Sequence, residues 1–288
     1  MRAAVVRTFG GPEAVEIADV EVPEPGAGQV RIKVAAAALN PVDAGRRSGF
    51  MGDMFGSLPL GSDVAGTIDA TGPDAQWSVG DKVVALAVGT HAEYVIVDAD
   101  AVAKAPATAD EVQAATLALN ALTAAQALDL LELTAGQSLL VTGAAGAVGG
   151  YAVQLAAHRG VTVTALARAN DEELVRSLGA THVAGAGEAD FDAVLDAGAL
   201  GEPALARVRD NGTYVGVHPG AAPASVRGVR TDAVETRPDG ARLAELVQLA
   251  DQGVLTLRVA ETYPLAEAAK AHARLAEGGL RGRLVLVP

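Results

Sequence analysis

A glycine-rich run after an apolar segment carries the clearest potential for chemistry. Ser138–Thr142 is typical of a strand, small residues follow from Gly143 to Gly149, and Ala147–Arg159 is typical of a helix. Such residues let the backbone approach a pyrophosphate, and a helix N-terminus offers N–H groups and positive dipole. The Gly-x-x-Gly-x-x-Gly spacing puts the first glycine one place from the usual motif. The predicted dinucleotide-binding residues are Gly143, Ala145, Gly146, Ala147, Val148 and Gly149. The alternative is an ordinary tight strand–helix turn.

The second predicted strand, Val161–Leu166, indicates which dinucleotide binds. A fold that prefers NAD places Asp or Glu at the end of this strand, for the ribose 2′-hydroxyl. Here Ala167 and Arg168 follow instead, and a guanidinium suits a 2′-phosphate. The later acids are explained as the first turn of a helix, with Asn170 as N-cap and Glu173 as its capping partner. We therefore predict NADPH as cofactor; an exposed Arg168 without a ligand is the alternative.

Composition excludes several classes of partner and site. The net charge of −13 argues against a nucleic-acid partner, although it does not exclude one small anionic cofactor. Zero cysteines exclude disulfides and thiolate metal sites, and the five histidines form no close-spaced ligand pair. No metal is expected. Neither a membrane span nor a signal peptide is evident, so a soluble cytoplasmic protein is expected.

The order of predicted elements indicates two domains of an α/β fold. Short strands cut by glycine and proline fill the first part of the chain, which is typical of a partly open antiparallel barrel. Strand and helix then alternate, as in a doubly wound parallel Rossmann sheet. A strand–helix–strand segment returns at the end. The predicted boundaries are 1–118 with 257–288 for the barrel domain, and 119–256 for the Rossmann domain.

Several modest motifs occur in a specific order along nearly the whole chain. They are Leu39-Asn40-Pro41-Val42-Asp43, Arg47-Ser48-Gly49-Phe50, Pro59-Leu60-Gly61-Ser62-Asp63-Val64-Ala65-Gly66, Ala92-Glu93-Tyr94, Leu119-Asn120-Ala121-Leu122-Thr123-Ala124, the glycine loop, and Tyr263-Pro264-Leu265 before Gly282-Arg283-Leu284-Val285-Leu286. Together they resemble the zinc-independent quinone oxidoreductase branch of the medium-chain dehydrogenase/reductase superfamily. The resemblance implies that the barrel domain is GroES-like.

The resemblance also implies roles for individual residues. It places Asn40 beside the nicotinamide, Asn120 and Thr123 in the same cleft, and Gly146, Ala147 and Val148 at the pyrophosphate; Val217 and His218 border the nicotinamide ribose. Asn40 could instead only shape a turn, and Thr123 could bond back within its helix. Phe50 stands where the family often has Tyr, which removes a hydroxyl. The expected catalytic set is Asn40, Phe50, Asn120 and Thr123, with Met51, Met54 and Phe55 on the lip of the cleft.

The expected activity is direct hydride transfer from NADPH to a quinone without metal. The alternatives are an NADPH-dependent enoyl or enone reductase and a non-catalytic NADPH-binding protein, since fold alone does not decide function. The partners expected are a small quinone or enone, no nucleic acid and no membrane. An extended stretch over Val226–Arg237, after the last Rossmann strands, indicates an edge strand, and the resemblance implies that it pairs across a two-fold axis in a homodimer. The alternative is a monomer whose edge is protected by Arg227, Arg230 and Pro238.

Overall fold

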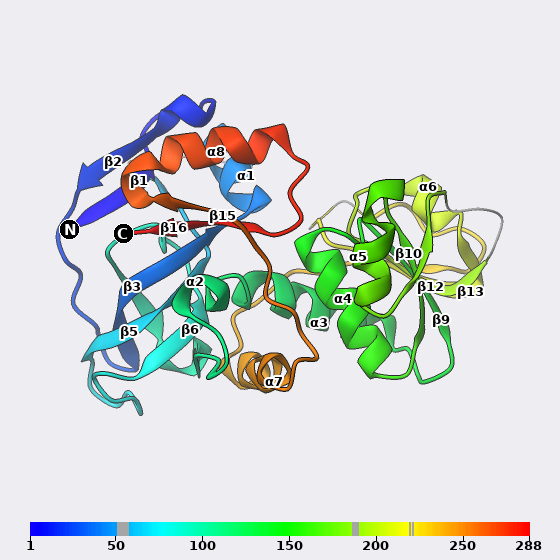
Figure 1. Ribbon diagram of the computed structural model, residues 1–288, viewed down its shortest axis with the longest axis horizontal. Helices are drawn as coiled ribbons and strands as arrows, with labels where there is room; N and C mark the ends of the chain where they lie inside the picture. The colour runs from blue at the N-terminus through cyan, green and yellow to red at the C-terminus, as the bar shows by residue number, and fades with distance from the viewer. Residues whose placement is uncertain (51–57, 186–189, 219, 221) are drawn as a thin grey trace. The chain divides into compact units, whose positions relative to one another are not determined.

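A computed structural model describes residues 1–50, 58–185, 190–218, 220 and 222–288. The chain divides into two compact units (Figure 1). The first contains Met1–Leu119, Pro238–Gln252 and Leu257–Pro288, and the second contains Asn120–Arg237 and Gly253–Thr256.

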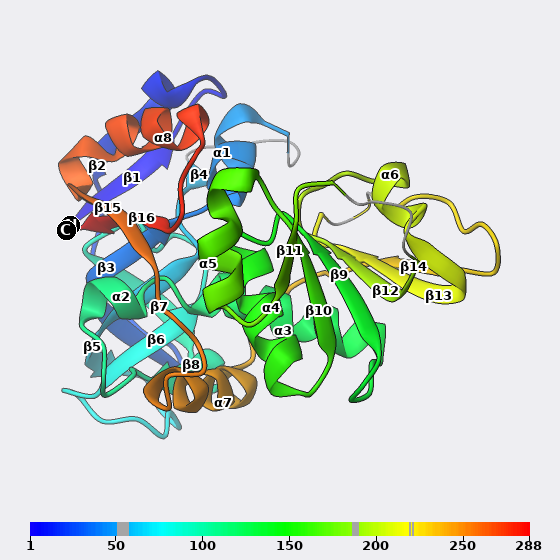
Figure 2. The same ribbon diagram turned by 45° about the vertical axis from the view of Figure 1, so that its right-hand side comes forward.

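The second unit is built on a six-stranded parallel sheet (Figure 2). Its strands are β9 (Ser138–Thr142), β10 (Thr162–Leu166), β11 (Thr181–Val183), β12 (Phe191–Asp196), β13 (Val208–Gly216) and β14 (Arg230–Ala233). Their order across the sheet is β11-β10-β9-β12-β13-β14. The order therefore reverses between β9 and β12, which is the doubly wound Rossmann arrangement, with a crevice where β9 and β12 end.

Helices precede or connect these parallel strands. They are α3 (Ala118–Leu131), α4 (Ala147–His158), η3 (Ala169–Asp171), α5 (Glu172–Ser177) and α6 (Glu202–Leu205). α4 packs on β9 and β10 and is buried from Gly149 to Ala156. Ala, Val and Leu side chains cover most of the surface of α4. A helix that is apolar on all sides is buried inside a protein, which explains the burial of α4.

The first unit holds a seven-stranded, mostly antiparallel sheet and a three-stranded sheet. The strands are β1 (Arg2–Val6), β2 (Val15–Asp19), β3 (Gln29–Leu39), β4 (Leu58–Pro59), β5 (Asp63–Thr71), β6 (Lys82–Leu86), β7 (Tyr94–Asp98), β8 (Val102–Lys104), β15 (Val259–Pro264) and β16 (Arg283–Val287). The helices are η1 (Pro12–Ala14), α1 (Pro41–Ser48), η2 (Ala99–Ala101), α2 (Glu111–Ala114), α7 (Gly240–Asp251), η4 (Leu265–Glu267) and α8 (Ala268–Glu277).

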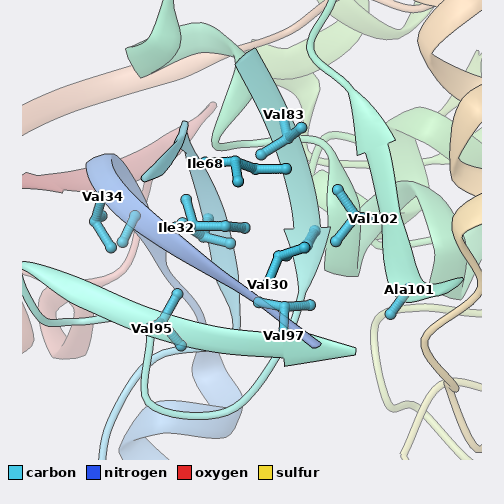
Figure 3. Packing of buried hydrophobic residues seen from close by; sticks show 12 residues of the cluster. Val30, Ile32, Val34, Ile68, Val83, Val95, Val97, Ala101 and Val102 are labelled. Atoms are coloured by element: carbon cyan, nitrogen blue, oxygen red, sulfur yellow. The ribbon is translucent and has the colours of Figure 1, made fainter. Parts of the chain in front are cut away.

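The long strand β3 organises the seven-stranded sheet. Two register shifts against β5 bend it, so that β7 pairs with its first half and β16 with its last residues. Every second residue, Val30, Ile32 and Val34, points into an apolar core with Ile68 and Val83 (Figure 3). Small β-branched side chains thus fill this core with few aromatics. These features confirm the predicted fold class, a Rossmann sheet with a GroES-like β-domain.

One predicted domain boundary differs from the structure. Pro238–Gln252, assigned above to the Rossmann domain, belongs to the first unit. The reason is packing: α7 lies on β8 and η2, and Gly240 is so close that a Cβ there would be 2.4 Å from the Asp100 carbonyl oxygen. Leu243 and Leu246 of α7 are buried in consequence. The sequence alone does not show which surface this helix covers.

One helical stretch has a length and composition that would suit either a membrane span or a buried helix. Glu111–Leu131, which contains α2 and α3, is long and apolar enough to cross a membrane, and it is the one such stretch among the described residues. However, 78% of its apolar window is buried inside the protein. That burial is typical of the core helix of a globular fold.

Candidate functional site

The crevice of the second unit lies where β9 and β12 end. β9 ends at Thr142 and β12 at Asp196, and the two residues are register partners. The loops that follow come together closely, because a Cβ on Gly143 would lie 2.9 Å from Gly198 Cα. Gly143 also has a φ of +57°, in the left-handed region that glycine adopts most readily. The two loops therefore meet through backbone atoms at this point.

The glycine loop fits a pyrophosphate, by its own geometry. A Cβ on Gly149 would lie 2.4 Å from the Gly143 carbonyl oxygen, so only glycine lets α4 approach the loop this closely. Gly146 is the N-cap of α4 and makes no side-chain cap. The first N–H groups of a helix have no partner within it, and together with the helix dipole they favour an anion. Gly143, Ala145, Gly146, Ala147 and Val148 thus form the kind of backbone cradle that holds a dinucleotide phosphate.

A buried carboxylate, Asp196, fixes the opposite wall of this crevice. It accepts hydrogen bonds from the hydroxyls of Thr142 and Tyr214 and from the backbone N–H groups of Leu200 and Gly201. Thr142 Oγ1 accepts in turn from the Gly198 N–H at 2.9 Å. Burial raises the pKa of Tyr214, as does its hydrogen bond to Asp196, so the phenol stays a donor. In the sequence, Asp196 has no local signal other than its place at the end of an apolar run.

Arg168 stands at the same edge of the sheet as the glycine loop. It follows β10, whose last residue Leu166 accepts a hydrogen bond from Ala144 N at 3.4 Å. The Arg168 side chain is exposed, and its backbone carbonyl lies 3.2 Å from His182 Nε2.

The predicted cap at Asn170 is wrong. Asn170 lies inside the short helix η3, and α5 begins at Glu172 with Asp171 as its N-cap. The two helices follow one another without a break, which leaves no extended residue at position 170 to act as a cap.

The remaining predicted site residues of the second unit lie at two separate locations. Val217 and His218 follow β13, next to β12, so both lie at the carboxyl edge; Val217 is half-buried and His218 is exposed. Asn120 and Thr123 are buried on α3. Thr123 Oγ1 lies 2.8 Å from Thr236 Oγ1, outside its own helix. Thr236 had no sequence signal, because the pairing joins residues 113 positions apart.

In the first unit, Asn40 sits at the junction of β3 and α1. It is the N-cap of α1, and its backbone N–H donates to Asp43 Oδ2 at 2.9 Å. Its side-chain Nδ2 donates to Asp63 Oδ2 at 2.7 Å and to the Ala38 carbonyl at 3.3 Å. Asn40 therefore does shape a turn, as the alternative held, and its amide is also fixed by a second carboxylate.

Asp63 and Asp43 are both completely buried. Asp63 Oδ1 accepts from the Leu119 N–H at 2.6 Å, and Asp43 Oδ1 accepts from the Gly61 N–H at 3.0 Å. Burial raises the pKa of Asp63 to about 7, against the lowering effect of its hydrogen bonds from Leu119 and Asn40. The sequence motifs contain both aspartates, but the analysis assigned neither to the site.

Comparison with known proteins gives the family. Residues 26–107 match the alcohol dehydrogenase GroES-like domain, and residues 171–286 match the family described as zinc-binding dehydrogenase. A chloroplast envelope quinone oxidoreductase homolog from Arabidopsis thaliana is 30% identical, over 100% of this chain and 98% of the relative. The chain belongs to the quinone oxidoreductase branch of the medium-chain dehydrogenase/reductase superfamily.

Solved structures of similar proteins agree with this family assignment. The quinone oxidoreductase from Coxiella burnetii superposes with a TM-score of 0.90 at 29% identity, over 100% of this chain and 99% of that one. A mycobacterial protein solved in complex with NADPH gives a TM-score of 0.86 at 29% identity, over 100% of both chains. An NADPH-dependent alkenal/one oxidoreductase from Arabidopsis thaliana is 35% identical over 80% of this chain; the chain spans 66% of that relative's length.

Phe50 follows the last turn of α1 and is 89% exposed, so it contacts little of the described protein. Met51, Met54 and Phe55, predicted to form the lip, lie outside the described residues. Among the residues that are described, no group of three or more His, Cys, Asp or Glu side chains is placed to hold a metal ion.

Proposed function

We propose that this protein is an NADPH-dependent reductase that delivers hydride to a quinone-type acceptor without a metal. One observation carries the proposal: a glycine cradle at the sheet crossover, with Arg168 at the end of the adjacent strand β10. The mycobacterial neighbour with bound NADPH and the NADPH-dependent relative support this choice of cofactor.

The residues of the chain bind and orient the cofactor. The N-terminus of α4, from Gly146 to Val148, holds the pyrophosphate, and Arg168 pairs with the 2′-phosphate. Val217 and His218 border the nicotinamide ribose, and Asn40, Asn120 and Thr123 act at the nicotinamide end. NADPH, when bound, supplies the hydride. Close contact and alignment with a flat acceptor then favour transfer.

The choice of a quinone as hydride acceptor follows from the absence of a proton donor among the candidate catalytic residues. The catalytic set offers no acid–base pair and no tyrosine at position 50, where Phe50 stands. A quinone tolerates this, because solvent can protonate its reduced oxygens. An enone instead requires a proton at carbon, which makes enone reduction the second candidate. It has specific support from the alkenal/one oxidoreductase relative. A non-catalytic NADPH-binding protein is the third.

Substituting Arg168→Ala tests the cofactor assignment. The wild type is expected to bind NADPH more tightly than NADH, and the variant to lose most of that preference. A charge-assisted contact accounts for about ten- to a hundredfold in affinity. Fluorescence titration of both cofactors measures the change.

Arg176→Ala is the matched control for this titration. Arg176 is an exposed arginine of the same unit that pairs with Glu172 at 2.7 Å. Its removal changes the net charge equally but touches nothing at the loop, so the preference for NADPH should persist. Equal wild-type affinities for NADPH and NADH, or equal effects of the two substitutions, contradict the role of Arg168.

A homodimer is part of the same proposal. β14 is the edge strand of the Rossmann sheet, so one side of its backbone has no neighbouring strand in the described protein. Soluble proteins usually cover such edges, and pairing about a two-fold axis would extend the sheet. Sedimentation at micromolar concentration should give twice the chain mass of 28.9 kDa. A single species at the chain mass throughout means that the edge is left unpaired in solution.

A further inference from the structure

A buried carboxylate joins three neighbouring strands of the Rossmann sheet, β9, β12 and β13 (Figure 2). Asp196, the last residue of β12, accepts from the hydroxyl of Thr142, the last residue of β9. It also accepts from the hydroxyl of Tyr214 on β13 at 2.8 Å. Asp196 is buried and beyond the reach of a bound molecule. Any effect of Asp196 on the crevice must therefore pass through the groups that donate to it.

The same carboxylate shapes residues 197–201, which follow β12. The N–H of Leu200 donates to Asp196 Oδ1 at 3.1 Å, and the N–H of Gly201 donates to Asp196 Oδ2 at 2.7 Å. Between these bonds and the strand, Ala199 has a φ of +54°. This is the left-handed region, which a residue with a side chain adopts at a cost in free energy. The hydrogen bonds to Asp196 thus hold the loop in a conformation that alanine alone does not favour.

Residues 197–201 also lie directly against the glycine loop. The N–H of Gly198 donates to Thr142 Oγ1 at 2.9 Å, and the hydroxyl of Thr142 donates in turn to Asp196. A Cβ on Gly143 would lie 2.9 Å from both the N and the Cα of Gly198, so the two backbones are in contact. Sheets of this kind bind ligands in the crevice that these two loops border. A shift of residues 197–201 therefore changes either the glycine loop or the width of the crevice.

We propose that Asp196 is a positioning residue for NADPH, which holds residues 197–201 beside the glycine loop so that the crevice accepts the pyrophosphate and the nicotinamide half. The inference rests on the proposed function, in which this crevice binds NADPH. Four groups donate to Asp196, and an ionised carboxylate accepts from several donors while offering none. Gly198, Ala199 and Leu200 are exposed, so these residues, unlike Asp196, are accessible to a bound cofactor.

The substitution Asp196→Asn tests the proposal, because it places one NH2 group among donors. If this group replaces Oδ1 it faces the N–H of Leu200, and if it replaces Oδ2 it faces the N–H of Gly201. A hydroxyl can turn its proton away from a new donor, but a backbone N–H cannot. One N–H of the loop therefore loses its partner in either orientation. The dissociation constant of NADPH, measured by fluorescence titration, should rise about ten- to a hundredfold.

Adenosine 2′-monophosphate is the probe that separates positioning from a general loss of structure. It carries the adenosine and the 2′-phosphate of NADPH but neither the pyrophosphate nor the nicotinamide. Its affinity, measured by calorimetric titration, should change less than about twofold in Asp196→Asn, because its contacts are independent of the loop. An equal loss of affinity for the probe and for NADPH overturns the proposal, since partial unfolding of the second unit would give that result.

Asp192→Asn is the matched control. Asp192 lies on the same strand as Asp196 and accepts from the N–H and the hydroxyl of Ser138, the first residue of β9. It joins the same two strands at the opposite edge of the sheet, so its substitution changes the charge equally but away from the crevice. NADPH affinity should stay within about twofold of the wild type. A loss as large as that in Asp196→Asn contradicts the role of Asp196.

A second pair of variants keeps the test decisive if Asp196→Asn does not fold. Thr142→Val removes the hydroxyl that links Gly198 to Asp196, whereas Thr142→Ser retains it. Thr142→Val should weaken NADPH binding about tenfold, and Thr142→Ser much less. Equal affinity of these two variants for NADPH overturns the proposal. A wild type that does not bind NADPH defeats the proposed function, whereas NADPH binding that Asp196→Asn and Thr142→Val leave unchanged defeats this inference alone.

Discussion

Substituting Gly149→Ala is expected to abolish tight NADPH binding and to destabilise the second unit. The added Cβ would lie 2.4 Å from the Gly143 carbonyl oxygen and 2.9 Å from Ala144 Cα, and both are backbone atoms. Because backbone cannot rotate away as a side chain can, α4 or the loop must move. Overpacking of this kind costs about 1–3 kcal/mol of unfolding free energy. The same displacement separates the N-terminus of α4 from the loop, so NADPH affinity should fall at least about tenfold.

Gly185→Ala provides the control for this experiment. Gly185 lies in the same unit, and a Cβ there would meet no atom of the described part of the chain within 4 Å. Thermal unfolding and NADPH titration of both variants separate a local steric effect from the general cost of alanine. Unchanged NADPH affinity in a folded Gly149→Ala protein contradicts the cradle.

Substituting His272→Leu is expected to stabilise the protein in acid. His272 of α8 is completely buried, and neither ring nitrogen has a hydrogen-bond partner among the residues that the structure describes. Burial, together with the neighbouring His91 and Arg47, lowers the pKa of His272 to about 3. The unfolded chain gains a proton below about pH 6.5, whereas the folded chain does so only near pH 3. The wild type therefore loses about 1.4 kcal/mol of unfolding free energy per pH unit across that window.

In the His272→Leu variant no group titrates at this position, and the ring nitrogens that lack hydrogen-bond partners in the described residues are gone. The stability advantage of His272→Leu should grow as pH falls, by about 3 kcal/mol between pH 6.5 and pH 4. Asp63 acts with the opposite sign, because its raised pKa makes stability fall as pH rises to about 7. The difference in unfolding free energy between the variant and the wild type therefore isolates the contribution of His272. His158→Leu, at an exposed histidine of α4, should leave the slope unchanged. A variant whose stability runs parallel to the wild type at all pH values contradicts the assignment.

The sequence predicted the elements that carry their own signals. Ser138–Thr142 is a strand with the predicted bounds, because it is an apolar run that ends at the glycine loop. The glycine loop was also predictable, because close backbone approach requires glycine wherever it occurs.

What the sequence did not reveal depends on contacts between distant residues. Asp63 and Asn40 are 23 positions apart, and Asp196 lies 54 positions from Thr142. An isolated aspartate in a motif does not show which donors surround it once the strands pair. The packing of α7 on β8 was not predictable for the same reason, because it depends on the surface that this helix meets in the folded chain.

The most direct test of the proposed function measures NADPH oxidation with two acceptors, a simple quinone and an α,β-unsaturated ketone, under identical conditions. The proposal predicts that NADPH is consumed faster than NADH, that activity survives a metal chelator, and that kcat/KM is higher for the quinone. Efficient reduction of the enone with little reduction of the quinone would replace the quinone assignment by the enone reductase. Tight binding of NADPH with reduction of neither acceptor would contradict the proposed activity.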